Sequence, residues 1–292
     1  MTVLKELPIG ARVREPQSGT VFLVADHHHT SWNGTTLVAD KVCMISCVDA
    51  AEPENPDPEI AQKGCNRYAV SNIHQWLNSD QKDWYQPLHA YDAPPVEESI
   101  SMRTDVFESK LFDPEGTFPP PYAYQDQPGY LYRFSEGFRN AILSSPVICF
   151  APSDPDIIYY GPPAGEIIHC KVFLLSAAEM GLENEIRREG YLIRLFQDPR
   201  MRMCAPENAA IHREESFDYK QSPVALWLRS PLGQSSCMGK IYQVEHKFGD
   251  VVGETLMPHP ANYAAGIRPA MNLDDNVSIG ERDVYGIYQL QL

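Results

Sequence analysis

The chain has 292 residues, 43% of them hydrophobic, and its 39 acidic and 24 basic residues give a formal net charge of −15 at pH 7. This apolar content is that of an ordinary globular protein with a sizeable core. The negative charge repels phosphate backbones, so we expect no nucleic-acid partner. No apolar stretch approaches the roughly 20 residues that cross a bilayer, and the first residues lack the pattern of a signal peptide. We therefore expect synthesis in the cytoplasm without membrane insertion.

The first 48 residues predict an N-terminal β-meander (residues 1–48). An apolar run over 21–25 follows a turn at 17–19, and Asn33-Gly34 is a strong hairpin signal before the next apolar stretch, 35–48. Successive strands joined by short turns are therefore expected here.

Two segments further along have the apolar spacing of short helices. The first begins after Ser71, a residue type that caps helices, and ends at Asn78. The second begins after Ser135 and is expected to continue until Pro146 stops it. Between the two helices, residues 80–130 are rich in proline and aromatic residues, and we interpret them as a long packed insertion.

The middle of the chain predicts further strands, over 147–150 and 167–175. The sequence Ser-Ala-Ala-Glu at 176–179 has the spacing of a capping box, so a short helix is expected to start there. The arginine-rich residues 184–213 leave helix and loop open as alternatives. Residues 287–290 predict a last strand.

Residues 224–273 carry the clearest pattern and predict a small antiparallel sheet as the C-terminal core. The expected strands are Ala225–Leu228, Lys240–Val244 and Ala265–Leu273. Trp227 and Ile267 are expected to face the core of this sheet.

Arg229 and Arg268 each stand beside a strand end and close to a proline. A buried guanidinium needs a carboxylate or backbone carbonyls as partners. We interpret both arginines as structural residues that pin strands and loops, with anion recognition as the alternative. Trp76 and Trp227 are likewise interpreted as core residues rather than ligand platforms.

Helices and strands without regular βαβ alternation indicate the α+β class. The sequence contains no internal repeat and no low-complexity linker. Residues 1–292 therefore predict a single domain with one large insertion.

Four sequence blocks, read together, resemble a known family. They are Ser71–Ser79, Val172–Ser176 with Glu179, Trp227–Pro231 and Gly266–Leu273. Together they resemble an uncharacterised domain family found in gut bacteria and their phages. The resemblance implies a C-type-lectin-like α+β fold, similar to the formylglycine-generating-enzyme superfamily and to phage receptor-binding variable proteins. Such a fold has two helices around a twisted antiparallel sheet, with long loops between its final strands.

The motifs of calcium-dependent sugar-binding lectins are missing from this sequence, which has neither a Glu-Pro-Asn or Gln-Pro-Asp triplet in the long loop nor a later Trp-Asn-Asp. Calcium-mediated sugar binding is therefore not expected. The resemblance implies a fold, but it implies no activity because the family has none established.

Catalytic and metal-binding motifs are missing as well. The chain lacks G-x-S-x-G, both glycine-rich phosphate loops, C-x-x-C and H-E-x-x-H. Its seven cysteines form no tight framework, which fits reduced thiols. Cys237 and His246 are a possible catalytic Cys–His pair, but an ordinary partly buried thiol is the preferred interpretation. Neither the His27–His29 triplet with nearby cysteines nor Asp274–Asn276 has the pattern of a zinc or calcium site, so no metal and no cofactor are expected.

Two loops flanking the expected central strand are the candidates for a ligand-facing surface, because serine, asparagine and tyrosine at loop tips make adaptable contacts. The candidate ligand-binding residues are Gln234, Ser235, Ser236, His259, Asn262 and Tyr263. The alternative is that both are plain connecting loops.

The sequence thus predicts a non-enzymatic binding protein, associated with a phage or prophage virion and recognising its receptor through lectin-like loops. The expected partners are a protein or glycan ligand, other virion subunits and a second copy of the chain. Two alternatives stay open: a structural assembly subunit, and an oxidoreductase of the formylglycine-generating type.

Overall fold

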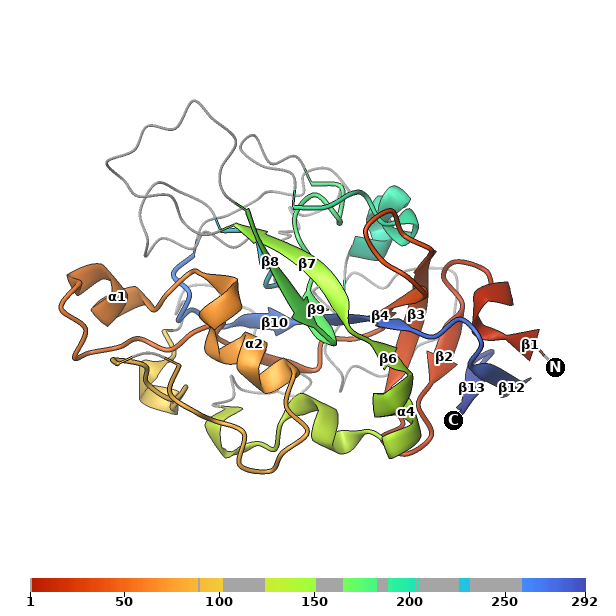
Figure 1. Ribbon diagram of the computed structural model, residues 1–292, viewed down its shortest axis with the longest axis horizontal. Coiled ribbons are helices and arrows are strands. Elements are labelled where there is room, and N and C mark those ends of the chain that lie inside the picture. The colour runs from red at the N-terminus through yellow and green to blue at the C-terminus, as the bar shows by residue number, and fades with distance from the viewer. Residues whose placement is uncertain are drawn as a thin grey trace, which may run out of the picture.

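The chain folds into a mixed α/β structure, mostly sheet with few helices (Figure 1). The structure is a computed structural model that describes residues 2–88, 90–101, 124–150, 165–182, 189–202, 204, 226–231 and 259–292. Both termini lie at the end of the molecule away from α1 (Figure 1). The α+β prediction is confirmed at this coarser level.

Within the described residues, the main sheet has nine strands in the order β1-β12-β13-β2-β3-β4-β11-β6, and β9 also pairs with β11. These strands are β1 (Thr2–Val3), β2 (Arg12–Arg14), β3 (Val21–His27), β4 (Thr35–Ala39), β6 (Ile142–Leu143), β9 (Val172–Leu174), β11 (Pro269–Leu273), β12 (Ser278–Arg282) and β13 (Tyr288–Gln291). Neighbours are antiparallel except β13 and β2, which run parallel and join the two ends of the chain.

The described residues also form two smaller ribbons and three short α-helices. The ribbons are β5 (Met44–Ser46) with β10 (Ala265–Ile267), and β7 (Ser145–Phe150) with β8 (Gly165–Cys170). The α-helices are α1 (Pro58–Lys63), α2 (Asn72–Leu77) and α4 (Glu136–Ala141). Single 3-10 turns lie at Leu4–Glu6, Tyr68–Val70, Glu97–Ser99, Tyr124–Asp126, Tyr130–Arg133, Arg194–Gln197 and Pro199–Arg202.

The N-terminal strands form the expected meander only as far as β4. β2, β3 and β4 are successive antiparallel neighbours, and Asn33-Gly34 lies in the β3–β4 hairpin. Gly34 has φ +78°, and a Cβ there would collide with the carbonyl of Leu273, so a glycine is required. β5 leaves this sheet and pairs with β10 near the other end of the sequence, which the meander prediction did not include.

Both predicted helix caps are confirmed. The Ser71 hydroxyl accepts from the His74 amide at 3.3 Å, and the Ser135 hydroxyl accepts from the Phe138 amide at 3.2 Å. The predicted end of the second helix is wrong, because α4 stops at Ala141, well before Pro146. The next two residues pair with β11 as β6, so sheet formation ends the helix before the proline does.

The capping box at Ser176 and Glu179 forms, but the helix expected after it does not. The Ser176 amide donates to Glu179 Oε2 at 3.0 Å, and the Glu179 amide donates to Ser176 Oγ at 3.1 Å. The chain then completes one turn and reverses at Gly181, whose φ is +69°. Glycine in this left-handed conformation typically ends a helix.

The strand predicted over 167–175 is two strands, β8 and β9, separated at Lys171. The amides of Lys171 and Val172 donate to Asn78 Oδ1 at 2.9 and 3.0 Å, so a side chain from the end of α2 accepts both amides. The predicted final strand is present as β13, whose hairpin partner β12 was missed.

The predicted local sheet over 224–273 is wrong in its pairing. Residues 225–228 were expected to form an antiparallel strand, but Leu226 makes only an isolated parallel bridge to Gly266. The stretch 265–273 is interrupted at Arg268, giving β10 and β11, whose strand partners come from β4, β5, β6 and β9. The strand expected over 240–244 lies outside the described residues.

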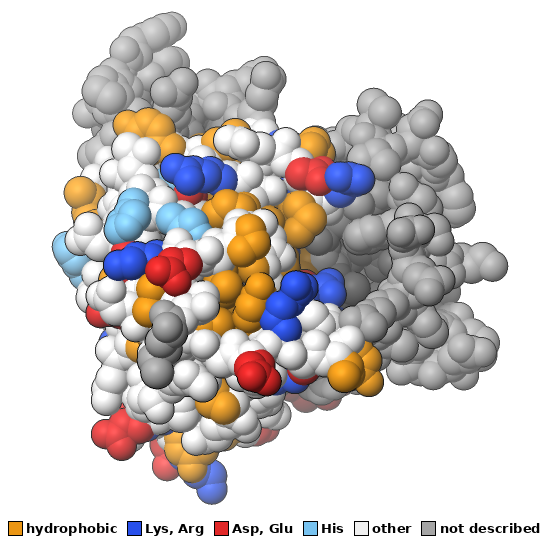
Figure 2. All heavy atoms as spheres, turned by 90° about the vertical axis from the view of Figure 1, so that its right-hand side faces the viewer, with side chains coloured by type: hydrophobic (Ala, Val, Ile, Leu, Met, Phe, Trp, Pro, Cys, Tyr) orange, Lys and Arg blue, Asp and Glu red, His pale blue; other side chains and the backbone are white. Residues whose placement is uncertain are grey.

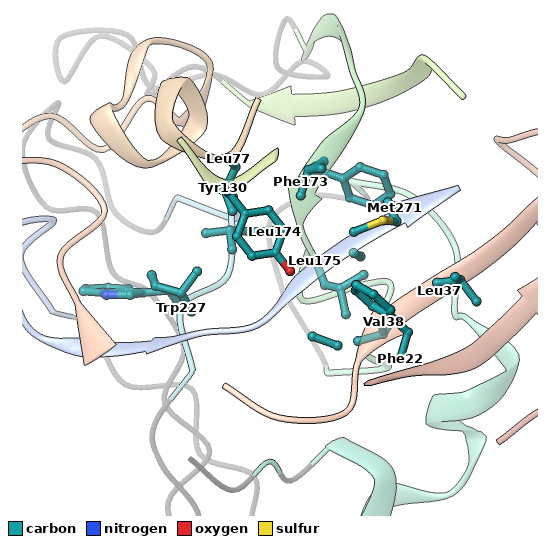
Figure 3. Close-up of a cluster of buried hydrophobic side chains, with 14 of the residues drawn as sticks. Phe22, Leu37, Val38, Leu77, Tyr130, Phe173, Leu174, Leu175, Trp227 and Met271 are labelled. Carbon is teal, nitrogen blue, oxygen red and sulfur yellow. The ribbon is translucent and has the colours of Figure 1, made fainter. Parts of the chain in front are cut away.

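The core joins side chains from every region of the described chain. Trp227, Phe173 and Met271 pack with residues of β3, β4 and α2 in the cluster drawn in Figure 3. Trp227 and Ile267 are 2% and 0% exposed, so the prediction that they face the core is confirmed. β11 passes through the middle of this core, between β4 on one side and β6 and β9 on the other.

Candidate functional site

Arg229 is the centre of a buried polar network. Its Nη1 donates to Glu179 Oε2 at 2.6 Å and to the Leu174 carbonyl at 2.7 Å. Its Nη2 donates to Glu179 Oε1 at 2.5 Å and to the Glu189 carbonyl at 2.8 Å, and Nε donates to the Ile148 carbonyl at 3.0 Å. These five hydrogen bonds use all five N–H groups of the guanidinium, so no N–H group is left to bind an external anion.

The same network fixes the charge of Arg229 and the position of its neighbour. Burial alone would lower the pKa of Arg229, but the adjacent Glu179 carboxylate more than offsets this and the pKa is raised. The next residue, Ser230, donates to the Glu189 carboxylate and accepts from the Ala177 amide at 2.9 Å. Residues 226–231 are therefore held firmly against the turn after β9.

Arg268 lies at the break between β10 and β11, where its side chain donates to backbone carbonyls. Its Nε donates to the Ala39 carbonyl and its Nη1 to the Met201 carbonyl, both at 2.9 Å. The guanidinium carbon lies 5.6 Å from the centre of the Phe196 ring, a cation–π distance. Arg268 thus ties the end of β4 to the turn at 199–202.

The two tryptophans lie in the core, each with its indole nitrogen bonded. Trp227 Nε1 donates to the Ser46 carbonyl at 2.7 Å, and Trp76 Nε1 donates to the Pro128 carbonyl at 2.9 Å. Both side chains are buried. A stacking surface for a ligand would need an exposed ring face, which neither of them offers.

A second buried polar network surrounds Asp49, which sequence reasoning did not single out. Its two carboxylate oxygens accept from the amides of Asn72, at the start of α2, and Cys65, at 3.0 and 2.8 Å. Burial raises the pKa of Asp49 well above its ordinary value, and the charges of Asp92 and Glu52 raise it further. A capping signal was visible only at Ser71, because Asp49 is far from α2 in sequence.

The segment 259–264 lies beside Asp49, and its residues are less exposed than the loop-tip prediction requires. The Ala261 carbonyl accepts from the amides of Val48 and Asp49 at 2.9 and 3.1 Å. Asn262 is only 6% exposed and donates through Nδ2 to the Gln62 carbonyl at 3.0 Å. Tyr263 is 8% exposed.

The expectation that Asn262 and Tyr263 lie at a loop tip is therefore wrong, since both pack into the structure. Tyr263 stacks on His259 with ring centres 4.4 Å apart and planes at 12°. His259 is half-buried. The other candidates, Gln234, Ser235 and Ser236, lie outside the described residues, as do Cys237 and His246.

The buried thiols have the chemistry of core residues. Burial raises the pKa of Cys170 to about 12 and that of Cys204 to about 11, and it raises the pKa of Cys47 and Cys149 as well. A raised pKa keeps a thiol protonated at neutral pH and therefore a poor nucleophile.

Among the described residues, histidine, cysteine, aspartate and glutamate side chains form no group of three or more that could hold a metal ion. Within the same part, no helix is both long enough and apolar enough to cross a membrane.

The fold and its networks define a mixed α/β domain in which buried arginines and carboxylates brace the sheet. The family model described as a domain of unknown function, DUF6273, matches residues 33–275. The chain therefore belongs to the DUF6273 family, and the expectation of an uncharacterised domain family is confirmed. Searches of the curated proteins and of the solved structures found no match.

Proposed function

We propose that this chain is a non-enzymatic binding protein with a lectin-like arrangement, which holds a protein or glycan through the long connections around β10. The resemblance to proteins of gut bacteria and their phages makes a receptor on a host cell the partner to test first. Virion association is part of the same proposal.

The observation that carries the proposal is the convergence of connection ends at one place. The Ser101 amide donates to the Asn262 carbonyl at 2.8 Å, and the Ala264 amide donates to the Ser101 carbonyl at 3.1 Å. Ser101 directly precedes the stretch 102–123, and Asn262 follows the stretch 232–258. One connection therefore starts where the other ends.

The third connection is the stretch 151–164, which directly follows β7. The Ile148 carbonyl in β7 accepts from Arg229 Nε, and Arg229 lies just before the stretch 232–258. The Trp227 amide donates to the Gly266 carbonyl at 2.9 Å, which sets this anchor beside β10. Loops placed on a rigid scaffold are where binding residues are commonly found.

The buried charges support binding rather than catalysis. Arg229 and Arg268 donate to groups of the protein itself, and the raised pKa of the buried thiols keeps them protonated. Groups that activate a substrate are instead partly exposed and face the reacting atoms. The described networks therefore act as braces for the connections.

The test is binding of the purified chain to a glycan array and to gut bacterial cells. One variant replaces residues 233–236 by Gly-Ser repeats, and a matched control replaces the exposed hairpin tip Val284-Tyr285 by Gly-Ser. We expect binding to fall at least about tenfold in the first variant, a typical loss for interface residues that contribute strongly. The control should bind like the wild type.

Two results would contradict the proposal in different ways. Unchanged binding by the 233–236 variant would remove this stretch from the site. No binding of the wild type to any cell or glycan, together with assembly into particles or polymers, would favour the structural-subunit alternative.

A further inference from the structure

The β7–β8 ribbon has one edge that side chains of the protein bind and one edge that is open. The Pro146 carbonyl in β7 accepts from Trp32 Nε1 at 2.8 Å, and the Ile148 carbonyl in β7 accepts from Arg229 Nε at 3.0 Å. These two side chains occupy the edge of β7 that faces away from β8. Among the described residues, the backbone of β8 pairs with β7 alone.

The register of the ribbon identifies the backbone groups on the open edge of β8. Pro146 lies opposite His169, and Ile148 lies opposite Ile167. Because the carbonyls of Pro146 and Ile148 point away from β8, these two pairs exchange no hydrogen bonds across the ribbon, and the pairs between them do. The amides and carbonyls of Gly165, Ile167 and His169 therefore point outward from the ribbon.

The same three residues also have their side-chain positions on the solvent face of the ribbon. Gly165, Ile167 and His169 are exposed, and Ile167 is 63% exposed. By contrast, Ile168 packs against the hydrophobic core and Cys170 is 6% exposed. An exposed isoleucine on an open edge of six residues favours pairing with another strand. A ribbon of two strands is only marginally stable by itself and gains stability from a further strand.

The one carboxylate of β8 is neutralised by a neighbouring arginine. Arg67 Nε and Nη2 donate to Glu166 Oε1 and Oε2 at 2.8 and 2.6 Å. Open edges are usually protected by proline or by uncompensated charges, and β8 contains no proline, lysine or arginine. Two copies of this edge can therefore meet without opposing like carboxylate charges.

The edges of the main sheet are different. β1 and β6 end its strand path, and each has only two residues. Figure 2 shows the face at the terminal strands, where acidic, basic and histidine side chains border the apolar ones. A short edge among charges is protected from pairing. Of these described edges, β8 is thus the one suited to receive another strand.

We propose that two copies of the chain associate through β8, as antiparallel strands related by a twofold axis at Ile167. In this register Ile167 lies opposite Ile167 of the second copy, and Gly165 lies opposite His169 of the second copy. All three pairs are of the hydrogen-bonded type, so each outward amide meets a carbonyl. The two ribbons become one four-stranded sheet in which the two isoleucine side chains are in contact.

The contact is small, so the dimer is weak and reversible. Besides backbone groups, β8 contributes one large exposed apolar side chain per copy, and stable interfaces commonly bury about 1,200 Å² or more. The net charge of −15 on each copy also opposes association. Because salt screens this repulsion, the dimer should become tighter as the ionic strength rises.

The test is sedimentation velocity of the whole chain at protein concentrations from about 10 to 500 μM. We expect the wild type to pass from monomer to dimer over this range, and at lower concentration in about 500 mM salt than in about 50 mM salt. Ile167→Lys places two ammonium groups opposite each other and should raise the dissociation constant at least about tenfold. Tyr132→Lys makes the same change of charge at a side chain that is 48% exposed and lies outside the ribbon, so it should dimerise like the wild type.

Amide exchange of the wild type tests the register without any substitution. As the protein concentration rises, exchange at Ile167 and His169 should slow, whereas exchange at Glu166 and Ile168, whose amides bond to β7, should stay the same. Exchange at Ile167 that does not depend on concentration would overturn the proposal, as would equal dissociation constants for the wild type and Ile167→Lys.

A wild type that stays monomeric at both salt concentrations would overturn the proposal as well, and would leave the edge of β8 to an extended segment of a different protein. None of these measurements involves a protein or glycan ligand. Failure of the dimer and failure of the proposed binding function are therefore distinguishable.

Discussion

The Glu179–Arg229 pair is the strongest candidate for a single side-chain change with a large effect. Both side chains are 1% exposed, and the carboxylate also receives the Ser176 amide. Removing one partner of a buried pair leaves the other charge without compensation, which is far more costly than losing a surface pair.

We expect Glu179→Gln to lower the free energy of unfolding by about 3–5 kcal/mol, because the Arg229 charge then stays buried without the carboxylate that it is paired with. Urea denaturation followed by tryptophan fluorescence measures this. Asp198→Asn, which breaks the exposed pair with Arg200, is the matched control and should cost less than about 1 kcal/mol. Equal effects of the two substitutions would contradict this view of Arg229.

His74 should make the stability of the protein depend on pH. Burial lowers the pKa of His74 to about 4, although the charge of Glu166 raises it slightly. In the unfolded chain a histidine has an ordinary pKa of about 6.5. The unfolded state therefore binds the proton first, so the stability that neutral His74 contributes is present above pH 6.5 and is lost as the pH falls toward 4.

We expect the free energy of unfolding of His74→Gln to depend less on pH between pH 7 and pH 4.5 than that of the wild type. The difference in free energy of unfolding between wild type and variant should shrink from pH 7 to pH 4.5, because only the wild type loses the contribution of a neutral buried imidazole. Urea titrations at these two pH values measure it. Parallel profiles for the two proteins would show that His74 does not carry the effect.

Secondary-structure elements could be predicted where the deciding bonds are local. The caps at Ser71 and Ser135 depend on amides three residues away, and the Asn33-Gly34 turn depends on the positive φ of Gly34, so all three were visible in the sequence. The break between β8 and β9 was not, because it depends on Asn78, 93 residues away from Lys171. The end of α4 likewise depends on β11.

The candidate site was less predictable than the fold for the same reason. Arg229 could be recognised as needing a partner, but Glu179 lies 50 residues away from it. Asn262 and Tyr263 have the composition of a binding loop, and only the distant residues at 48–49 and 62–63 explain why they pack inward. Residue type alone does not distinguish a loop tip from a polar segment tied down by backbone bonds.

Asn78 gives a prediction for the connection of α2 to the sheet. Its Oδ1 accepts from Lys171 and Val172, and its Nδ2 donates to the carbonyls of His74 and Val172 at 3.0 and 2.8 Å. We expect Asn78→Ala to cost about 1–3 kcal/mol, since it leaves several backbone groups without their partner. Amide exchange at Lys171 and Val172 should speed up most, which exchange NMR can measure.

The matched control for Asn78 is Gln81→Ala, which changes an exposed amide just after α2. It should alter neither stability nor exchange at β9. Unchanged exchange at Lys171 in Asn78→Ala would mean that the strand break has another cause.

At the scale of the whole molecule, the residue range matched by the family model is shorter than the range that forms the main sheet. The matched range 33–275 contains β4, β6, β9 and β11, whereas β1, β2, β3, β12 and β13 come from outside it. The outside strands are contiguous in the main sheet and continue it from the edge of β4. They are thus an integral half of one sheet rather than an appended module.

We therefore expect residues 33–275 expressed alone not to fold cooperatively. Removing β3 exposes the edge of β4 and takes away Phe22, which is fully buried and stacks on Phe138 at 5.6 Å. Losing one such side chain costs about 3–5 kcal/mol, and a whole domain is stable by only about 5–15 kcal/mol. Glu15, which binds the Ser135 amide at the start of α4, is lost as well.

Near-ultraviolet circular dichroism and urea titration should show no single sharp transition for 33–275, whereas a chain lacking only Thr2 and Val3 of the edge strand β1 should unfold like the wild type. A cooperative transition in the short chain would mean that the family unit holds its own core and that the terminal strands are an addition to it.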